Sequence, residues 1–210
     1  LLSVTLPCPE DWPPSFGNLE DELGVDAQGL WSVYLELFNT LRESQCTSYL
    51  EGTNSREDFF SPRNRPAFFT IDSREKAGAR AIHSWLPSQG HSNRRLDYIR
   101  KLLKKTGKYN NADLTDQAHS VLNQLIELPG FLEYMEKIGL VVAESDQKLG
   151  VINRLNHSAW RVLYKPQLIY RCNVCHSITH NNVNDVCPVY SCDGSLEPFK
   201  RDTEDQMSYF

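Results

Sequence analysis

The sequence predicts a mainly α-helical protein with small β elements, organised as a winged-helix-like domain followed by a zinc ribbon. Three features indicate this: apolar side chains recur at helical spacing in several segments, two strand-like runs follow the last of them, and four cysteines lie near the C-terminus in two close pairs. The 210 residues, 40% of them hydrophobic, suffice for a substantial core. We expect a helical region with an acidic entry at residues 1–90, the winged-helix-like domain at 91–166, the zinc ribbon at 167–200 and a connector at 201–210.

The N-terminal region is predicted to contain one long helix. This helix begins near Asp26, and the apolar stripe with three- and four-residue spacing consists of Leu30, Val33, Tyr34, Leu37, Phe38 and Leu41. A polar loop with several helix-breaking residues follows, and the apolar run at 67–71 favours a short strand. The stretch DSREKAGARAIHSWLP at 72–87 is typical of a short helix that ends at its proline.

The middle of the chain predicts three helices and a β-hairpin. The first helix lies within SNRRLDYIRKLLKKTGK at 92–108, with Gly107 as its C-terminal cap, and the others lie at 113–128 and 131–139. The runs LVVAE and GVINRL, joined by a polar loop, form the hairpin. This is the element order of a winged helix, but the third helix carries Glu133 and Glu136 and is a poor partner for phosphate.

Charge is distributed very unevenly along the chain. Residues 1–60 carry 11 acidic and 2 basic side chains, residues 61–110 carry 3 acidic and 12 basic, and residues 111–210 carry 13 acidic and 8 basic. The basic block indicates contact with nucleic acid phosphate. An equally acceptable interpretation is a solvated face that pairs with the acidic N-terminal block.

The four cysteines follow the pattern C-x2-C-x11-C-x4-C, at Cys172, Cys175, Cys187 and Cys192. Two close pairs of thiolates separated by a loop are suited to a tetrahedral Zn²⁺ site. A disulfide is disfavoured because nothing else indicates secretion, whereas an iron–sulfur cluster stays open. Four protein ligands leave no position for water, so we expect a structural metal, with His176 and His180 outside the ligand set.

The sequence contains none of the common catalytic motifs. There is no H-E-x-x-H, no Walker A motif, no G-x-G-x-x-G and no G-x-S-x-G, and Cys8 and Cys46 are isolated and are best read as small buried hydrophobes. A stand-alone enzyme is therefore a remote alternative. We expect a cytoplasmic protein without a membrane span or signal peptide. Because the sequence has no initial methionine and no closing cap, we expect either a recombinant fragment or an internal piece of a longer protein.

Three stretches together resemble a segment of large bacterial superfamily 2 DEAD/DEAH-box helicases, of the kind found in mitomycin repair and in the phage-defence systems Druantia and DISARM. They are WLPSQGHSNRRLDYIRKLL at 85–103, GVINRLNHSAWRVLY at 150–164, and IYRCNVCHSITHNNVNDVCPVYSCDGSLEPF at 169–199. In these helicases a W-L-P … R-R-L-D-Y stretch, a winged-helix-like piece and an R-C-x-x-C … C-P-x-x-x-C-x-G-x-L zinc module occur in this order. The resemblance covers about residues 85–210, with His176 in place of the usual glycine and Met207 in place of a histidine.

The resemblance implies a non-catalytic accessory segment of an ATP-dependent helicase, with ATP and Mg²⁺ used elsewhere in the parent protein and a role in anti-phage defence or DNA repair. The partners would be single-stranded or duplex DNA and other domains of the helicase or a defence-system subunit. The charge pattern predicts phosphate contacts by Arg94, Arg95, Arg100, Lys101, Lys104 and Lys105.

Two points about these contacts stay open in the sequence. Trp85, Trp160 and Tyr164 are candidates for base stacking, although a place in the core is the more common role for such residues. The alternative function is a protein-interaction module with a structural zinc, which docks a partner subunit and does not bind nucleic acid.

Overall fold

The structure is a computed structural model that describes residues 2–10, 12, 17–50, 52–53, 67–71, 81–88, 90–128, 130–147, 150–164 and 168–199. The fold is mixed α/β, with 38% helix and 23% strand; five helices and nine strands in three sheets are described. The expectation of a mainly α-helical fold is therefore wrong. The expectation failed because short segments that are far apart in the sequence pair as strands, and no local hydrophobic periodicity predicts this pairing.

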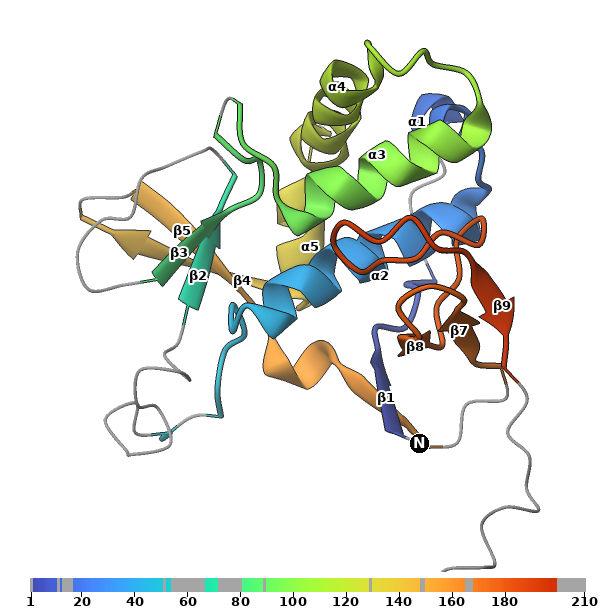
Figure 1. The fold of residues 1–210 in the computed structure, drawn as a ribbon. Helices are drawn as coiled ribbons and strands as arrows, with labels where there is room; N and C mark the ends of the chain where they lie inside the picture. Colours follow the sequence, from blue (N-terminus) through green and yellow to red (C-terminus); the bar gives the residue numbers. More distant parts are fainter. Residues whose placement is uncertain are drawn as a thin grey trace, which may run out of the picture.

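Helix α2 (Ala27–Glu43) lies at the centre of the fold (Figure 1). Its N-terminus is capped by Asp26, whose carboxylate accepts a hydrogen bond of 2.7 Å from the backbone N of Gly29. The predicted stripe is confirmed, since all six of its side chains are buried. Helix α1 (Gly17–Leu23) precedes α2 and packs against both α2 and α3.

Three further helices follow in the middle of the chain. They are α3 (Arg94–Thr106), α4 (Leu114–Glu127) and α5 (Phe131–Lys137). The Asn93 side chain caps the start of α3 by accepting a hydrogen bond from Leu96 N at 2.9 Å. Gly107 ends this helix with a φ of 70°, a left-handed conformation that confirms its predicted role as a cap.

The predicted hairpin is confirmed as β4 (Val141–Asp146) and β5 (Gly150–Leu155), but it is not a free wing. Strand β5 also pairs with β2 (Ala67–Thr70), which pairs in parallel with β3 (Ala81–Ser84), so the sheet order is β3-β2-β5-β4. Strand β2 confirms the expected strand. The helix expected at 72–87 is wrong where the chain is described, because pairing with β2 draws Ala81–Ser84 into the sheet.

Two smaller sheets complete the fold. Strand β1 (Leu2–Thr5) pairs antiparallel with β6 (Arg161–Tyr164), which follows the short 3-10 helix η2 (His157–Ala159). Strands β7 (Tyr170–Cys172), β8 (Ile178–Thr179) and β9 (Leu196–Pro198) form the third sheet, in the order β8-β7-β9. Figure 1 shows this sheet and its red connecting loop beside α2 and α3.

One hydrophobic core extends through all three predicted folded segments. It includes Leu6 and Leu30 from the first segment, Leu102 and Leu155 from the second, and Val186 from the cysteine-rich segment. The predicted borders at 90/91 and 166/167 stay predictions, and the core is continuous across both. The cysteine-rich segment is thus packed onto the helices.

Candidate metal centre and its contacts with the helices

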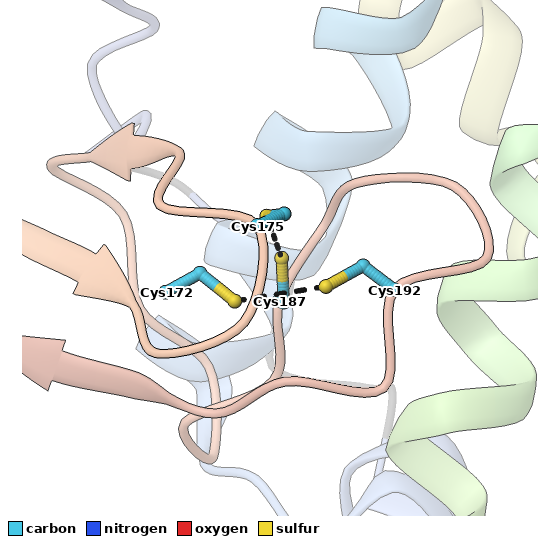
Figure 2. Close-up of side chains that lie close together, drawn as sticks. All are labelled: Cys172, Cys175, Cys187 and Cys192. Atoms are coloured by element: carbon cyan, nitrogen blue, oxygen red, sulfur yellow. Dashed lines mark hydrogen bonds between the residues drawn. The ribbon is translucent and has the colours of Figure 1, made fainter.

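Four cysteine sulfurs converge in the cysteine module, which we define as residues 168–199. Cys172 ends β7 and Cys175 follows in the next turn, while Cys187 and Cys192 flank a loop at 188–191, here called the knuckle loop. The four sulfurs lie within 4.8 Å of one another. Figure 2 shows the side chains pointing toward a common centre. The cluster can therefore hold one metal ion.

The sulfur separations match a tetrahedral metal site. Cys172 Sγ lies 3.6 Å from Cys192 Sγ, and Cys175 Sγ lies 3.6 Å from Cys187 Sγ. A disulfide would require about 2.05 Å. Four sulfurs placed tetrahedrally at about 2.3 Å from Zn²⁺ would be separated by about 3.8 Å. The geometry is compatible with zinc, and within the described residues this is the one group of three or more His, Cys, Asp or Glu side chains close enough to share a metal.

The backbone around the sulfurs is built for close approach. A Cβ placed on Gly194 would overlap Cys172 Sγ and would lie 2.9 Å from Cβ of Val174, so only glycine fits there without a shift of the neighbouring sulfur. His176 has a φ of 60°, the left-handed region that glycine adopts most readily. A glycine at this position would adopt the conformation without strain.

The thiols differ in acidity because their surroundings differ. Burial raises the pKa of Cys187 to about 12 and also raises that of Cys192. Burial acts in the same direction on Cys175, but hydrogen bonds from the hydroxyl and backbone of Ser177 outweigh it and lower this pKa to about 6. Since metals bind thiolates, a metal that enters the cluster must displace protons from Cys187 and Cys192 at neutral pH.

The knuckle loop is attached to α3 by a buried ion pair. Lys101 Nζ donates to Val189 O at 2.7 Å and to Cys192 O at 3.2 Å, and lies 2.9 Å from Asp97 Oδ2. Asp97 in turn accepts a hydrogen bond from Ser191 N at 3.0 Å. Both charged side chains are about 5% exposed. These bonds fix two backbone groups at the end of the loop to α3: the amide of Ser191, which precedes the fourth cysteine, and the carbonyl of Cys192.

The loop between the two cysteine pairs is attached to α1 and α2. Asn181 Nδ2 donates to Ser32 O and to Glu36 Oε1, both at 2.9 Å. Asn184 Nδ2 donates to Leu23 O at 3.3 Å and to the next carbonyl. Burial raises the pKa of Glu36 to about 7, so its carboxyl group is half protonated near neutral pH. Together with the α3 contacts, these bonds hold the cysteine module against three helices.

The predicted phosphate contacts fall into two groups. Arg95 and Lys101 are buried and bonded to protein: Arg95 donates to Trp85 O, Ser84 O and Thr40 Oγ1, and Lys101 binds the knuckle loop. In this fold neither side chain can reach a phosphate, and their assignment as phosphate contacts is corrected to a structural role.

The other four cations are accessible. Arg94 is half exposed but forms an ion pair of 2.5 Å with Glu43, which supports the interpretation that part of the basic block pairs with the acidic N-terminal block. Arg100 is 42% exposed and also contacts Asp97 at 3.1 Å. Lys104 and Lys105 are exposed and line a hollow beside the knuckle loop.

The three aromatic candidates for base stacking lie in different environments. Trp85 is fully buried and donates from Nε1 to Leu122 O at 2.9 Å, so it belongs to the core. Trp160 packs partly buried against the same core, with the guanidinium of Arg42 over its ring at 5.3 Å. Tyr164 on β6 is 73% exposed.

Sequence reasoning missed the residues that attach the cysteine module to the helices. Asn181 and Asn184 carry a visible signal, the asparagine-rich stretch HNNVN between the two cysteine pairs. Lys101 and Asp97 gave none, because a lysine four residues after an aspartate on a basic helix looks like an ordinary surface ion pair.

Comparison with known proteins does not assign the chain: no protein family, no curated protein and no solved structure matches it. None of the described helices is long and apolar enough to cross a membrane.

Proposed function

We propose that this chain is a non-catalytic segment whose four cysteines hold one structural Zn²⁺, and that the metal fastens the cysteine module onto α1, α2 and α3. The observation that carries this proposal is the pair of hydrogen bonds from Lys101 to the carbonyls of Val189 and Cys192. These bonds connect the knuckle loop and the cysteine that follows it directly to α3. Four sulfur ligands leave no open coordination position, so the ion stabilises the fold and does not activate water.

We further propose that the exposed cations of α3 contact nucleic acid phosphate. Arg100 and Lys104 are four residues apart, one turn of the helix, and Lys105 is adjacent. Asp185 and Asp193 line the hollow beside the lysines, so we place the phosphates on the solvent side of the ammonium groups. Three contacts to a single strand imply a salt slope of about 2, or about a 20-fold loss of affinity between about 50 and 200 mM salt.

The sequence resemblance supplies the context of this proposal. In the helicases that the chain resembles, a cysteine module of this pattern belongs to an ATP-driven motor that consumes ATP with Mg²⁺ in other domains. As such a segment, this chain would guide a strand or place a neighbouring domain. Its own residues would bind phosphate and keep the helices in position, in anti-phage defence or DNA repair.

Fluorescence anisotropy with labelled single-stranded and duplex oligonucleotides tests the phosphate contacts. Lys104→Glu and Lys105→Glu should each weaken binding at low salt and reduce the salt slope by about 0.7. Lys137→Glu on α5 is the matched control, because it makes the same charge change at an exposed lysine outside α3. Asp193→Asn should strengthen binding. Equal affinities for all four variants would contradict the proposed contacts.

A second candidate function is docking of a partner protein. Strand β6 favours it, because Val162 and Tyr164 are 66% and 73% exposed, and Leu168 just beyond it is 62% exposed. Exposed apolar side chains that gather on one strand are frequent at protein interfaces. Absence of any oligonucleotide binding at about 50 mM salt would favour this function over the first.

A further inference from the structure

A groove of about 750 Å³ lies beside the knuckle loop, and its lining shares no residue with the hollow at Lys104 and Lys105. Its walls come from residues 86–87 and 90–92, from α3, from the first turns of α4 and from the knuckle loop. Leu86, Pro87 and Leu96 supply apolar surface, and the partly exposed side chains of Tyr190 and Arg100 also line the groove. The volume is in the range of sites that take small organic groups.

Tyr190 is the aromatic residue of the knuckle loop, and its side chain is 45% exposed. Its position is fixed by its neighbours: Val189 O is bonded to Lys101, and Ser191 N is bonded to Asp97. The loop is also closed at both ends by metal ligands, Cys187 and Cys192. An exposed ring on a loop restrained in this way loses little conformational freedom when a flat ligand stacks on it.

The charges in the groove favour a neutral group over a phosphate. Asp97 is neutralised, since its oxygens accept from Arg100 at 3.1 Å, from Lys101 at 2.9 Å and from Ser191 N. Asp116, exposed at the start of α4, offers a carboxylate, while His91 and His119 offer ring nitrogens. The lining holds two carboxylates, Asp97 and Asp116, and one cation, Arg100, so a planar, uncharged, hydrogen-bonding ligand suits it better than a phosphate.

We propose that this groove binds one unpaired nucleobase of a single strand, stacked on Tyr190, while the adjoining phosphates lie along Lys104 and Lys105. The inference rests on the proposed nucleic acid binding and adds to it a base site and a preference for single strands. A base inside a duplex cannot reach the ring without leaving its stack. Arg100 borders the groove and belongs to the same helix as the two lysines, which makes the base site continuous with the phosphate contacts.

The test compares changes at Tyr190 with a change outside the groove, in the zinc-loaded protein. Tyr190→Ala should weaken binding of a labelled single-stranded oligonucleotide roughly 5- to 150-fold, the range for loss of one stacked base. Tyr190→Phe keeps the ring and should bind within about twofold of the wild type. Val151→Ala removes an exposed apolar side chain of β5 outside the groove and should have no effect. Metal content and urea midpoint, measured on each variant, show that the fold is retained.

The outcomes separate the base site from the phosphate contacts. If Lys104→Glu and Lys105→Glu weaken binding while Tyr190→Ala matches Val151→Ala, the base site is refuted and the phosphate contacts stand. Equal affinity of the wild type for single-stranded and duplex DNA would also overturn the base site. If no oligonucleotide binds the wild type at low salt, both proposals fall together.

Discussion

Lys101→Met should detach the knuckle loop from α3 and thereby weaken both the fold and the metal site. Methionine keeps most of the unbranched side chain that packs in the helix interface but removes the ammonium group. Three oxygens lose their donor: Val189 O, Cys192 O and Asp97 Oδ2. All belong to a contact in which the lysine is only 6% exposed, so water cannot readily replace it.

The size of the effect follows from what remains after the change. Breaking a buried ion pair costs about 3–5 kcal/mol, since one charge stays buried without its partner. Asp97 retains Arg100 and the backbone N of Ser191, which places the expected loss of unfolding free energy at the lower end, about 3 kcal/mol. Loss of a group that orients a metal ligand typically lowers metal affinity about 10- to 100-fold, and we expect this range here.

Urea denaturation of the zinc-loaded protein, followed by tryptophan fluorescence, measures the first quantity, and competition with a chromophoric chelator measures the second. Lys104→Met is the control, because it makes the same change at an exposed site of the same helix and should shift stability by less than about 0.5 kcal/mol. Adding Asp97→Asn to Lys101→Met should cost less than the sum of the single changes. If the Lys101→Met protein matches the Lys104→Met protein in both measurements, the proposed attachment of the knuckle loop to α3 through Lys101 is refuted.

Four further predictions follow from the geometry. Glu36→Gln should remove one source of pH dependence in the free energy of unfolding. The folded-state pKa of Glu36, about 7, lies above the usual 4.5, so the protonated carboxyl group favours folding below about pH 4.5. This contribution is lost as pH rises through 7, by up to about 3 kcal/mol. Urea midpoints at pH 5 and pH 8 should therefore differ less in the variant than in the wild type. Gly194→Ala should lower zinc content, because its Cβ would overlap Cys172 Sγ; a fully loaded alanine variant would contradict this. The His176→Gly protein should retain zinc, and its thermal midpoint should be equal to or higher than that of the wild type, because glycine adopts a φ of 60° without strain. A clearly lower midpoint would count against this argument. Removal of metal with a chelator should expose amides of the cysteine module to hydrogen exchange before those of α4, and uniform exchange would contradict a local clasp.

The sequence predicted the elements whose cause is local. The stripe of α2, the Gly107 cap of α3 and the β4–β5 hairpin each depend on spacing or on one residue with a special conformation. The convergence of the four cysteines was predictable in the same way, because the two close pairs leave few arrangements of the sulfurs.

What failed depends on pairing between distant segments. Strand β3 was mistaken for a helix because it becomes a strand by pairing with β2. The sequence around β3 carries no periodic signal of that pairing. The basic block misled for another reason. A lysine or arginine has the same letter whether it faces solvent or, like Arg95 and Lys101, satisfies buried carbonyl groups, and only the fold distinguishes the two cases.

Zinc K-edge X-ray absorption on the purified protein tests the central claim most directly. We predict one zinc per chain with four sulfur neighbours at about 2.3 Å and no nitrogen or oxygen in the first shell. A nitrogen or oxygen ligand would mean an open site or a histidine in place of a cysteine. Iron in place of zinc, or no bound metal in protein whose cysteines are reduced, would contradict the structural zinc that the proposed function requires.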